Sequence, residues 1–298
     1  MSRGFALAVV LFAAALVLAA PAVGADEVLT RDRTAANVST HSGQPVWSRV
    51  GRDGQARLVQ RLRGRNRDLP VAPKAGLFDP DVGTTPRGNM TVVYSRCAGL
   101  SGQGCDIWQY DGFDLKERKV RGASTASCSE FAPSVWLGSV AFARTGPGRC
   151  NGLYVVRRGK LRKLDVRVPA DTDLRGGRVA YLYVPPGDTF RSYLRVRNLR
   201  DKRSRLIVTG FAAERESYGI SSPVLTGRYV HWLQEDRVRN DFFAGRALVG
   251  RRPVLEFTQR TFPGRVDSIA ITRERFYYTN GRGLYLATDP QPIFAARG

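Results

Sequence analysis

The sequence predicts an all-β protein in which six four-stranded antiparallel sheets surround a central axis, as the blades of a six-bladed β-propeller. The clearest unit runs from Glu130 to Leu164, where four apolar segments are separated by turns at Gly138-Ser139, Thr145 to Gly148 and Arg158-Gly159. An aromatic residue in the second segment of this unit has counterparts along the chain, at intervals of 47, 48, 39, 51 and 46 residues. Such intervals are typical of one four-stranded blade. The aromatic residues are Trp47, Tyr94, Phe142, Tyr181, Trp232 and Tyr278.

Taken in order, the six units are predicted at about 38–71, 78–120, 130–164, 165–208, 219–257 and 265–297. A glycine turn precedes the aromatic residue in the first five units, whereas the last has Thr272 to Glu274 there. One such sheet cannot bury both of its faces, so neighbouring sheets must stack until the ring closes. We therefore expect the six aromatic side chains to fill the space between adjacent blades. The segment from Asp26 to Asn37 either adds an outer strand to the last blade or simply leads into the ring.

The first 25 residues have the pattern of a secretory signal peptide. Arg3 precedes an apolar run from Phe5 to Ala20, and small residues follow up to Ala25. The run is short for a membrane span, although an uncleaved anchor is the alternative interpretation. Cleavage after Ala25 would leave residues 26–298 as a single secreted or extracytoplasmic propeller domain, periplasmic or in the cell envelope, with no stable membrane insertion.

Four cysteines in an exported chain predict two disulfides. Cys97 and Cys105 flank the loop between the second and third strands of unit two, so we expect them to pair. Cys128 precedes unit three and Cys150 lies in its loop between the second and third strands, at the same rim. Metal binding by these cysteines is disfavoured because neither a CxxC spacing nor a histidine partner is present.

The chain is strongly basic, with 47 Lys and Arg residues against 26 Asp and Glu residues. Such a charge attracts polyanions. The basic residues are spread over every unit, and the dense cluster Arg57 to Arg67 contains no aromatic residue on which a base could stack. The arginine usage is typical of a high-GC bacterial genome; the alternative is selection for binding an anionic cell-wall polymer, a lipid headgroup or nucleic acid. An anionic cell-envelope polymer or an unknown protein is the expected partner of a monomer. Specific nucleic-acid binding is not expected.

Units two and three carry a family resemblance. A proline and glycine turn precede the strand Val92-Val93-Tyr94-Ser95, and Cys105 to Asp111 reads CDIWQYD. This pattern resembles the repeat of TolB-like six-bladed propellers. The resemblance covers nearly the whole mature chain by periodicity but only two units by motif, and the Ser-Pro-Asp-Gly turn usual in that family is missing. It implies the fold and an extracytoplasmic address, and it does not extend to the partners of TolB itself.

Acidic residues near the start of the first strand in several units suggest a site. In a propeller these strands line the central channel, so their side chains would converge at one rim. Converging carboxylates could form a funnel that binds a hard cation or a basic group. They could equally bond nearby backbone donors. The candidate ligand-binding residues are Asp81, Glu130, Asp171, Asp173, Glu216 and Asp267, with Asn37 in unit one.

Catalytic motifs are sparse. The two histidines are His41, expected at the rim opposite the carboxylates, and His231, expected in the core. No Gly-x-Ser-x-Gly, Walker or dinucleotide motif is present. The favoured function is therefore a non-catalytic binding or interaction module that needs no cofactor and has no catalytic residues. The alternative is a metal-dependent lactonase-like or other hydrolase, with calcium or another divalent cation held by the funnel carboxylates.

Overall fold

The computed structural model describes residues 26–99, 103–188, 191–201, 203–212, 217–236, 241–249, 255–258, 262, 265–272, 275–287 and 294–296. The signal peptide predicted for residues 1–25 lies outside the described residues. In the described part every regular element is a β-strand, and the strands form six four-stranded antiparallel blades. The predicted all-β six-bladed propeller is confirmed. No helix of this part is long and apolar enough to cross a membrane.

The first three blades are separate four-stranded sheets. Blade 1 comprises β2 (Ala36–His41), β3 (Gln44–Val50), β4 (Ala56–Leu62) and β5 (Arg65–Asp68). Blade 2 comprises β6 (Asp81–Thr84), β7 (Met90–Arg96), β8 (Asp106–Asp111) and β9 (Lys116–Lys119). Blade 3 comprises β10 (Ser129–Trp136), β11 (Ser139–Thr145), β12 (Gly152–Arg157) and β13 (Lys160–Asp165).

Blades 4 and 5 are joined into one sheet by a short pairing of their adjoining strands. Blade 4 comprises β14 (Asp171–Arg175), β15 (Arg178–Tyr183), β16 (Arg191–Asn198) and β17 (Ser204–Ala212). Blade 5 comprises β18 (Ser217–Thr226), β19 (Tyr229–Asp236), β20 (Asp241–Leu248) and β21 (Leu255–Thr258), to which β25 (Phe294–Ala296) adds.

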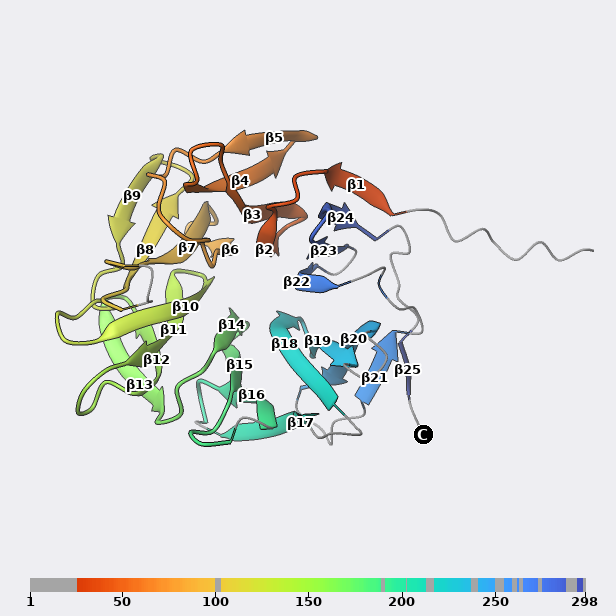
Figure 1. The fold of residues 1–298 in the computed structure, drawn as a ribbon. Helices are drawn as coiled ribbons and strands as arrows, with labels where there is room; N and C mark the ends of the chain where they lie inside the picture. The colour runs from red at the N-terminus through yellow and green to blue at the C-terminus, as the bar shows by residue number, and fades with distance from the viewer. Residues whose placement is uncertain are drawn as a thin grey trace, which may run out of the picture.

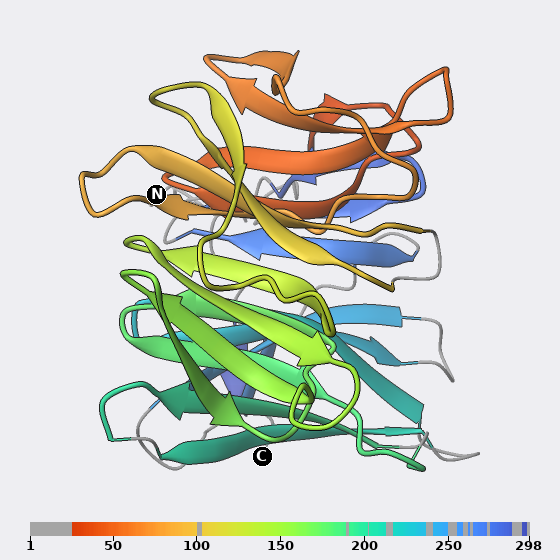
Figure 2. The same cartoon turned by 90° about the vertical axis from the view of Figure 1, so that its left-hand side faces the viewer.

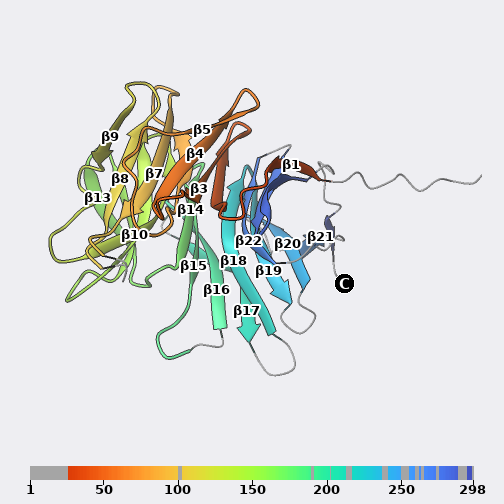
Figure 3. The ribbon, with the colours of Figure 1, turned by 45° about the horizontal axis from the view of Figure 1, so that its top comes forward.

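Both ends of the chain contribute to the closure of the ring. Blade 6 takes β22 (Val266–Ile271), β23 (Phe276–Asn280) and β24 (Gly283–Leu286) from the end of the sequence and β1 (Glu27–Thr30) from its beginning. Glu27 pairs with Leu286 and Val28 with Tyr285, so β1 is the outer strand of the last blade. The tilted view in Figure 3 shows β1 beside these strands. Of the two roles expected for this segment, the structure shows the closing strand.

The first strand of each blade lies innermost, so β2, β6, β10, β14, β18 and β22 surround the axis (Figure 1). The aromatic residue on each second strand is almost fully buried. Tyr94 packs with Val46 and Leu58 of the preceding blade, and Trp232 packs with Ala180 and Leu194 of the blade before its own. The other four aromatic residues are placed in the same way, one at each remaining blade interface. Their predicted role in packing adjacent blades is thus confirmed.

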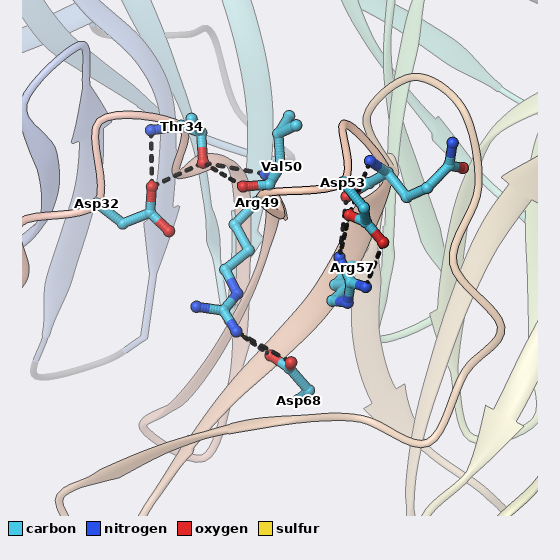
Figure 4. Close-up of polar contacts among 8 residues, drawn as sticks. Asp32, Thr34, Arg49, Val50, Asp53, Arg57 and Asp68 are labelled. Atoms are coloured by element: carbon cyan, nitrogen blue, oxygen red, sulfur yellow. Dashed lines mark hydrogen bonds and ion pairs between the residues drawn. The ribbon is translucent and has the colours of Figure 1, made fainter.

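The outer part of blade 1 is held by charged contacts (Figure 4). Arg49 on β3 donates to both carboxylate oxygens of Asp68 on β5, at 2.8 and 2.9 Å. Arg57 holds Asp53, which lies in the turn between β3 and β4. Asp32 and Thr34 bond each other before β2, and Thr34 Oγ1 accepts the N–H of Val50. Several arginines of this basic chain therefore serve the fold itself.

Two disulfides are present, Cys97–Cys105 and Cys128–Cys150, and they are the pairs expected from the sequence. The first closes the loop between β7 and β8, and the second ties the entry to β10 to the loop between β11 and β12. Disulfides persist in oxidising compartments, so they indicate an extracytoplasmic protein.

Candidate functional site

Irregularities in the inner strands shape the axial site; one lies between Val266 and Ser268 in β22, and the other three share a backbone feature. The pairing register shifts between Ala36 and Ser39 in β2, between Phe131 and Ser134 in β10, and between Ser221 and Val224 in β18. At each of these three bulges one residue has a left-handed backbone: Asn37 (φ 53°), Ala132 (φ 47°) and Ser222 (φ 50°). A bulge adds one residue and redirects the side chains beside it. All three left-handed residues line the axial cavity.

The axial cavity has a volume of about 480 Å³ and takes its walls from the inner strands of all six blades. Volumes of this size suit a small-molecule ligand. Five aspartates line it, namely Asp79, Asp81, Asp171, Asp173 and Asp267. Four of the six residues predicted for a carboxylate funnel are among them.

Asp81 begins β6 and connects three blades. Its Oδ1 accepts the hydroxyl of Ser39 on blade 1 at 2.7 Å, and its Oδ2 accepts the N–H of Val135 on blade 3 at 2.7 Å. Burial raises the pKa of Asp81, and the nearby charge of Asp173 raises it further. Both oxygens of Asp81 therefore already accept hydrogen bonds, and its carboxylate links blades 1, 2 and 3.

Asp171 and Asp173 stand on β14. Burial raises the pKa of Asp171 to about 7, and the charges of Asp173 and Asp79 add to this effect. Burial also raises the pKa of Asp173, against the stabilising hydrogen bond from Leu225 N–H on blade 5 and the charge of Arg175. Asp171 accepts only the N–H of its neighbour Thr172, at 2.8 Å, in the part of the chain that the structure describes. Asp171 therefore has the most capacity left for a ligand.

The remaining predicted residues behave differently. Asp267 lines the cavity and pairs with Arg265 at 3.2 Å. Glu130 is fully buried outside the cavity, because Arg144 stands opposite it on β11 and binds its carboxylate at 2.9 Å. Its predicted place in the funnel is therefore wrong, since a cross-strand ion pair turns the side chain into the blade. Glu216 lies outside the described residues.

Asp79 was not predicted, although it is two residues before Asp81. It accepts the N–H and hydroxyl of Ser95 at 2.7 and 2.8 Å, and the N–H of Ala132 on blade 3 at 3.2 Å. The sequence Asp79-Pro80-Asp81 contained the signal, because alternate residues of an extended chain lie on one side.

The other end of the cavity has a different chemistry. The guanidinium carbon of Arg175 lies 4.9 Å from the centre of the Trp136 ring, and the His41 ring centre lies 5.6 Å from the same ring. Burial, with the charge of Arg175, lowers the pKa of His41. His41, Trp136 and Arg175 are close to the last residues of β2, β10 and β14, whereas the aspartates are near the strand starts. Thus His41 lies at the rim opposite most of the carboxylates, where the sequence analysis expected it.

Thr40 adds a buried polar group to this wall. Its side chain is more than nine-tenths buried, and its hydroxyl has no hydrogen-bond partner among the described residues. An unpaired buried hydroxyl is costly, so a ligand that supplied a partner would recover that free energy.

His231 is buried in blade 5 and its Nε2 lies 2.6 Å from the hydroxyl of Thr226. It belongs to the core, as expected from its place beside Trp232.

The aspartates of the cavity raise the question of a metal site. Among the residues that the structure describes, no group of three His, Cys, Asp or Glu side chains is placed to hold a metal ion. The oxygens of Asp81 and one oxygen of Asp173 already accept hydrogen bonds from hydroxyl or backbone groups. The described donor set does not fit a resident cation.

Comparison with known proteins supports the fold and does not define a family. No protein-family model matches the sequence, and no curated protein matches it. Among solved structures, the chain is similar to the SapL1 lectin in complex with alpha methyl fucoside, with a TM-score of 0.55, 13% identity, and coverage of 91% of this chain and 98% of the lectin. It is similar to AofleA from Arthrobotrys oligospora, with a TM-score of 0.54, 11% identity, and coverage of 90% and 89%.

A third similar structure is a puromycin-hydrolyzing peptidase from Mycobacterium tuberculosis, with a TM-score of 0.53 and 12% identity. The match covers 90% of this chain and 53% of the peptidase, so the chain spans about half of that protein's length. Identities this low show the fold alone. The fold and cavity thus define the chain as a six-bladed β-propeller whose axial cavity is lined by five aspartates.

Proposed function

We propose that the protein is an exported, non-catalytic binding propeller that takes a small hydroxyl-rich ligand, such as one saccharide unit, into its axial cavity. The main evidence is that three groups line the same cavity. They are the carboxylate of Asp171, which accepts a single hydrogen bond among the described residues, the unpartnered hydroxyl of Thr40 and the partly exposed ring of Trp136.

Each of these groups suits a polyol. A carboxyl group whose pKa is about 7 can accept or donate a hydrogen bond near neutral pH, and a sugar hydroxyl can do either in return. The Thr40 hydroxyl gains a partner on binding. The Trp136 ring offers apolar contact for the C–H groups of a sugar. The guanidinium of Arg175, whose carbon lies over this ring at 4.9 Å from its centre, supplies further donors. The lectin similarity is consistent with this proposal, although it reports only the shared fold.

The non-catalytic part of the proposal rests on the hydrogen bonds. Asp81 and Asp173 hold neighbouring blades together through their carboxylates, so they are poorly placed to exchange protons with a substrate. The disulfides support an extracytoplasmic address. Within that address, a binding or interaction role in the cell envelope or the extracellular space remains the sequence-based proposal.

Isothermal titration calorimetry with a panel of neutral monosaccharides and short oligosaccharides tests the proposal. We expect at least one sugar to bind, and Asp171→Asn, Thr40→Val and Trp136→Ala to weaken it by about tenfold each, the equivalent of one lost hydrogen bond to a charged group or one aromatic contact. Asp201→Asn, an exposed carboxyl in the turn after β16, is the matched control and should bind as the wild type does.

Failure of every sugar to bind would reject the saccharide assignment. Binding that ignores all three cavity substitutions would place the site elsewhere on the molecule.

A further inference from the structure

One end of blades 2 and 3 exposes apolar side chains on hairpin turns. Phe113 and Leu115 in the turn between β8 and β9 are 76% and 61% exposed. Leu137 between β10 and β11 is 51% exposed, and Leu161 just after the turn between β12 and β13 is 40% exposed. These residues, with the cations around them, are called here the turn surface. It lies apart from the starts of the inner strands, where most of the cavity carboxylates stand.

The turns of this surface are neighbours. Gly112 N–H donates to Met90 O at 3.0 Å, which joins the β8–β9 turn to the start of β7. Gly138 N–H donates to Thr84 O at 2.9 Å, which joins the β10–β11 turn to the β6–β7 turn. In blade 3 the β10–β11 and β12–β13 turns lie at the same end of the sheet, as shown by the strand pairs Trp136–Ser139, Ser139–Arg157 and Arg157–Lys160. In the side view of Figure 2 the hairpin turns of blades 2 and 3 project on the left.

Backbone hydrogen bonds hold the β8–β9 turn that carries two of the exposed apolar residues. Phe113 N–H donates to the Asp111 carboxylate at 2.9 Å, and Leu115 N–H donates to Asp111 O at 2.9 Å. Leu137 has a left-handed backbone (φ 46°) in the two-residue turn between β10 and β11, where glycine or asparagine is favoured. Leu115 also has a left-handed backbone (φ 56°), at the end of the four-residue turn between β8 and β9. A large apolar residue in that conformation, exposed at a turn tip, is disfavoured by both strain and solvation, and such outliers suggest a functional surface.

Cations surround these tips. Arg87, Lys116, Arg157, Arg158 and Lys160 are exposed. The two acidic groups of the β8–β9 turn, Asp111 and Asp114, both pair with Arg118. The turn surface therefore has a positive excess around separate apolar tips, on a chain whose formal charge is +21.

We propose that the turn surface docks peripherally on an anionic lipid bilayer, with the apolar tips entering the interface and the cations binding lipid phosphates. Charge complementarity supports this docking, because each Lys or Arg near an anionic membrane adds to binding. The protruding, separated tips favour a bilayer over a folded partner, since a soft interface accepts single apolar side chains without a matching pocket. A soluble anionic polymer would leave those tips without a partner.

Sedimentation of the disulfide-bonded protein with phosphatidylcholine vesicles, with and without phosphatidylglycerol, tests the proposal. We expect binding only to the anionic vesicles. The triple variant Phe113→Ser, Leu115→Ser, Leu137→Gly should lose at least about tenfold in affinity, because apolar burial adds to electrostatic binding. The control is the double variant Val166→Ser, Val184→Ser. It removes two exposed apolar groups that follow β13 and β15, at the end of the blades opposite the turn surface, and should leave binding unchanged.

The cations are tested separately. Arg157→Gln with Arg158→Gln should weaken vesicle binding by about fivefold for each charge removed. Arg52→Gln with Arg149→Gln, two exposed arginines in loops at the other end of the blades, is the matched control. Phe113→Trp should gain fluorescence quenching by brominated lipids beyond that of the wild type, which reports insertion itself.

No sedimentation with anionic vesicles would overturn the proposal. The surface would instead be assigned to a polymer if soluble polyphosphate bound as tightly as the vesicles did and if the apolar triple variant weakened neither kind of binding. Each variant's melting temperature, compared with the wild type, separates a loss of docking from a loss of folding.

Discussion

Asp171 brings a titratable group into the axial cavity at the centre of the ring. Protein surrounds it on β14, and the nearby aspartates disfavour its charged form, so its pKa rises to about 7. An unfolded aspartate titrates near pH 4. Between these two values the folded state holds a proton that the unfolded state has lost, so the free energy of unfolding falls as pH rises from about 4 to about 7.

Asp171→Asn should flatten this dependence. The variant has no titratable group at this position, so the slope of unfolding free energy against pH should become less negative by up to about 1.4 kcal/mol per pH unit. Urea denaturation of the wild type and the variant at several values between pH 4.5 and 6.5 measures it. Asp201→Asn, which removes an exposed carboxyl, should leave the slope as it is. Parallel curves for Asp171→Asn and the wild type would show that the cavity does not hold this proton.

Other residues show how far single positions could be predicted from the sequence. The six aromatic residues were predictable because each occupies the same place in a repeat, and a repeated buried position leaves a periodic trace. Gly245 could not be predicted, although a Cβ there would collide with the Trp232 ring. That requirement depends on how one side chain crosses the neighbouring strand, and no local pattern encodes it.

At the scale of the strands, β1 contributes an apolar side chain to the closing interface. Leu29 is 6% exposed and packs in a cluster with Trp47, Tyr277 and Leu284, whereas Val28 next to it is 41% exposed. The alternation along β1 therefore separates a buried position from an exposed one on the same strand.

Leu29→Ala should lower the free energy of unfolding by about 2–4 kcal/mol, through lost burial and the cavity left behind. Val28→Ala should change it by less than about 0.5 kcal/mol, since exposed substitutions away from special features cost little. Chemical denaturation measures both, and hydrogen exchange should show faster opening of β24 in the first variant only. Equal effects of the two substitutions would mean that β1 does not close the ring in solution.

The bulges in β2, β10 and β18 mark the limit of prediction for the strands. Glu130 was predicted in the funnel because it lies near the start of a first strand that was expected to be regular. Side chains alternate only in a regular strand, and one added residue changes which way the next ones point. Asn37, Ala132 and Ser222 are not the glycines that would have signalled a left-handed residue in advance.

Across the whole molecule, the repeat predicted the number of blades but not which side chains meet across the axis. His41, Trp136 and Arg175 come from blades 1, 3 and 4, and their contact depends on the width and tilt of the ring. The spacing of the sequence repeats does not encode the width or the tilt of the ring. The candidate site was therefore predicted at its carboxylate end and missed at its aromatic end.

The binding proposal assigns no metal ion to the cavity, and this point can be tested on the whole molecule. The midpoint of thermal unfolding should be the same, within about 1 °C, in calcium, magnesium, zinc or chelator, because only a ligand that binds the folded state shifts it. Differential scanning calorimetry measures this. A midpoint that rises with the concentration of one of these metals would favour the hydrolase alternative over the binding proposal.

The pairing of β1 with β24 has a consequence for the order of assembly. Glu27 and Leu286 are partners, although nearly the whole chain separates them. A ribosome makes β1 first and β24 almost last, so the earliest strand must wait, unpaired, through the synthesis of all six blades. Nascent chains stopped before residue 283 cannot complete the sixth blade, and resistance to proteases should arise late and abruptly as chain length increases.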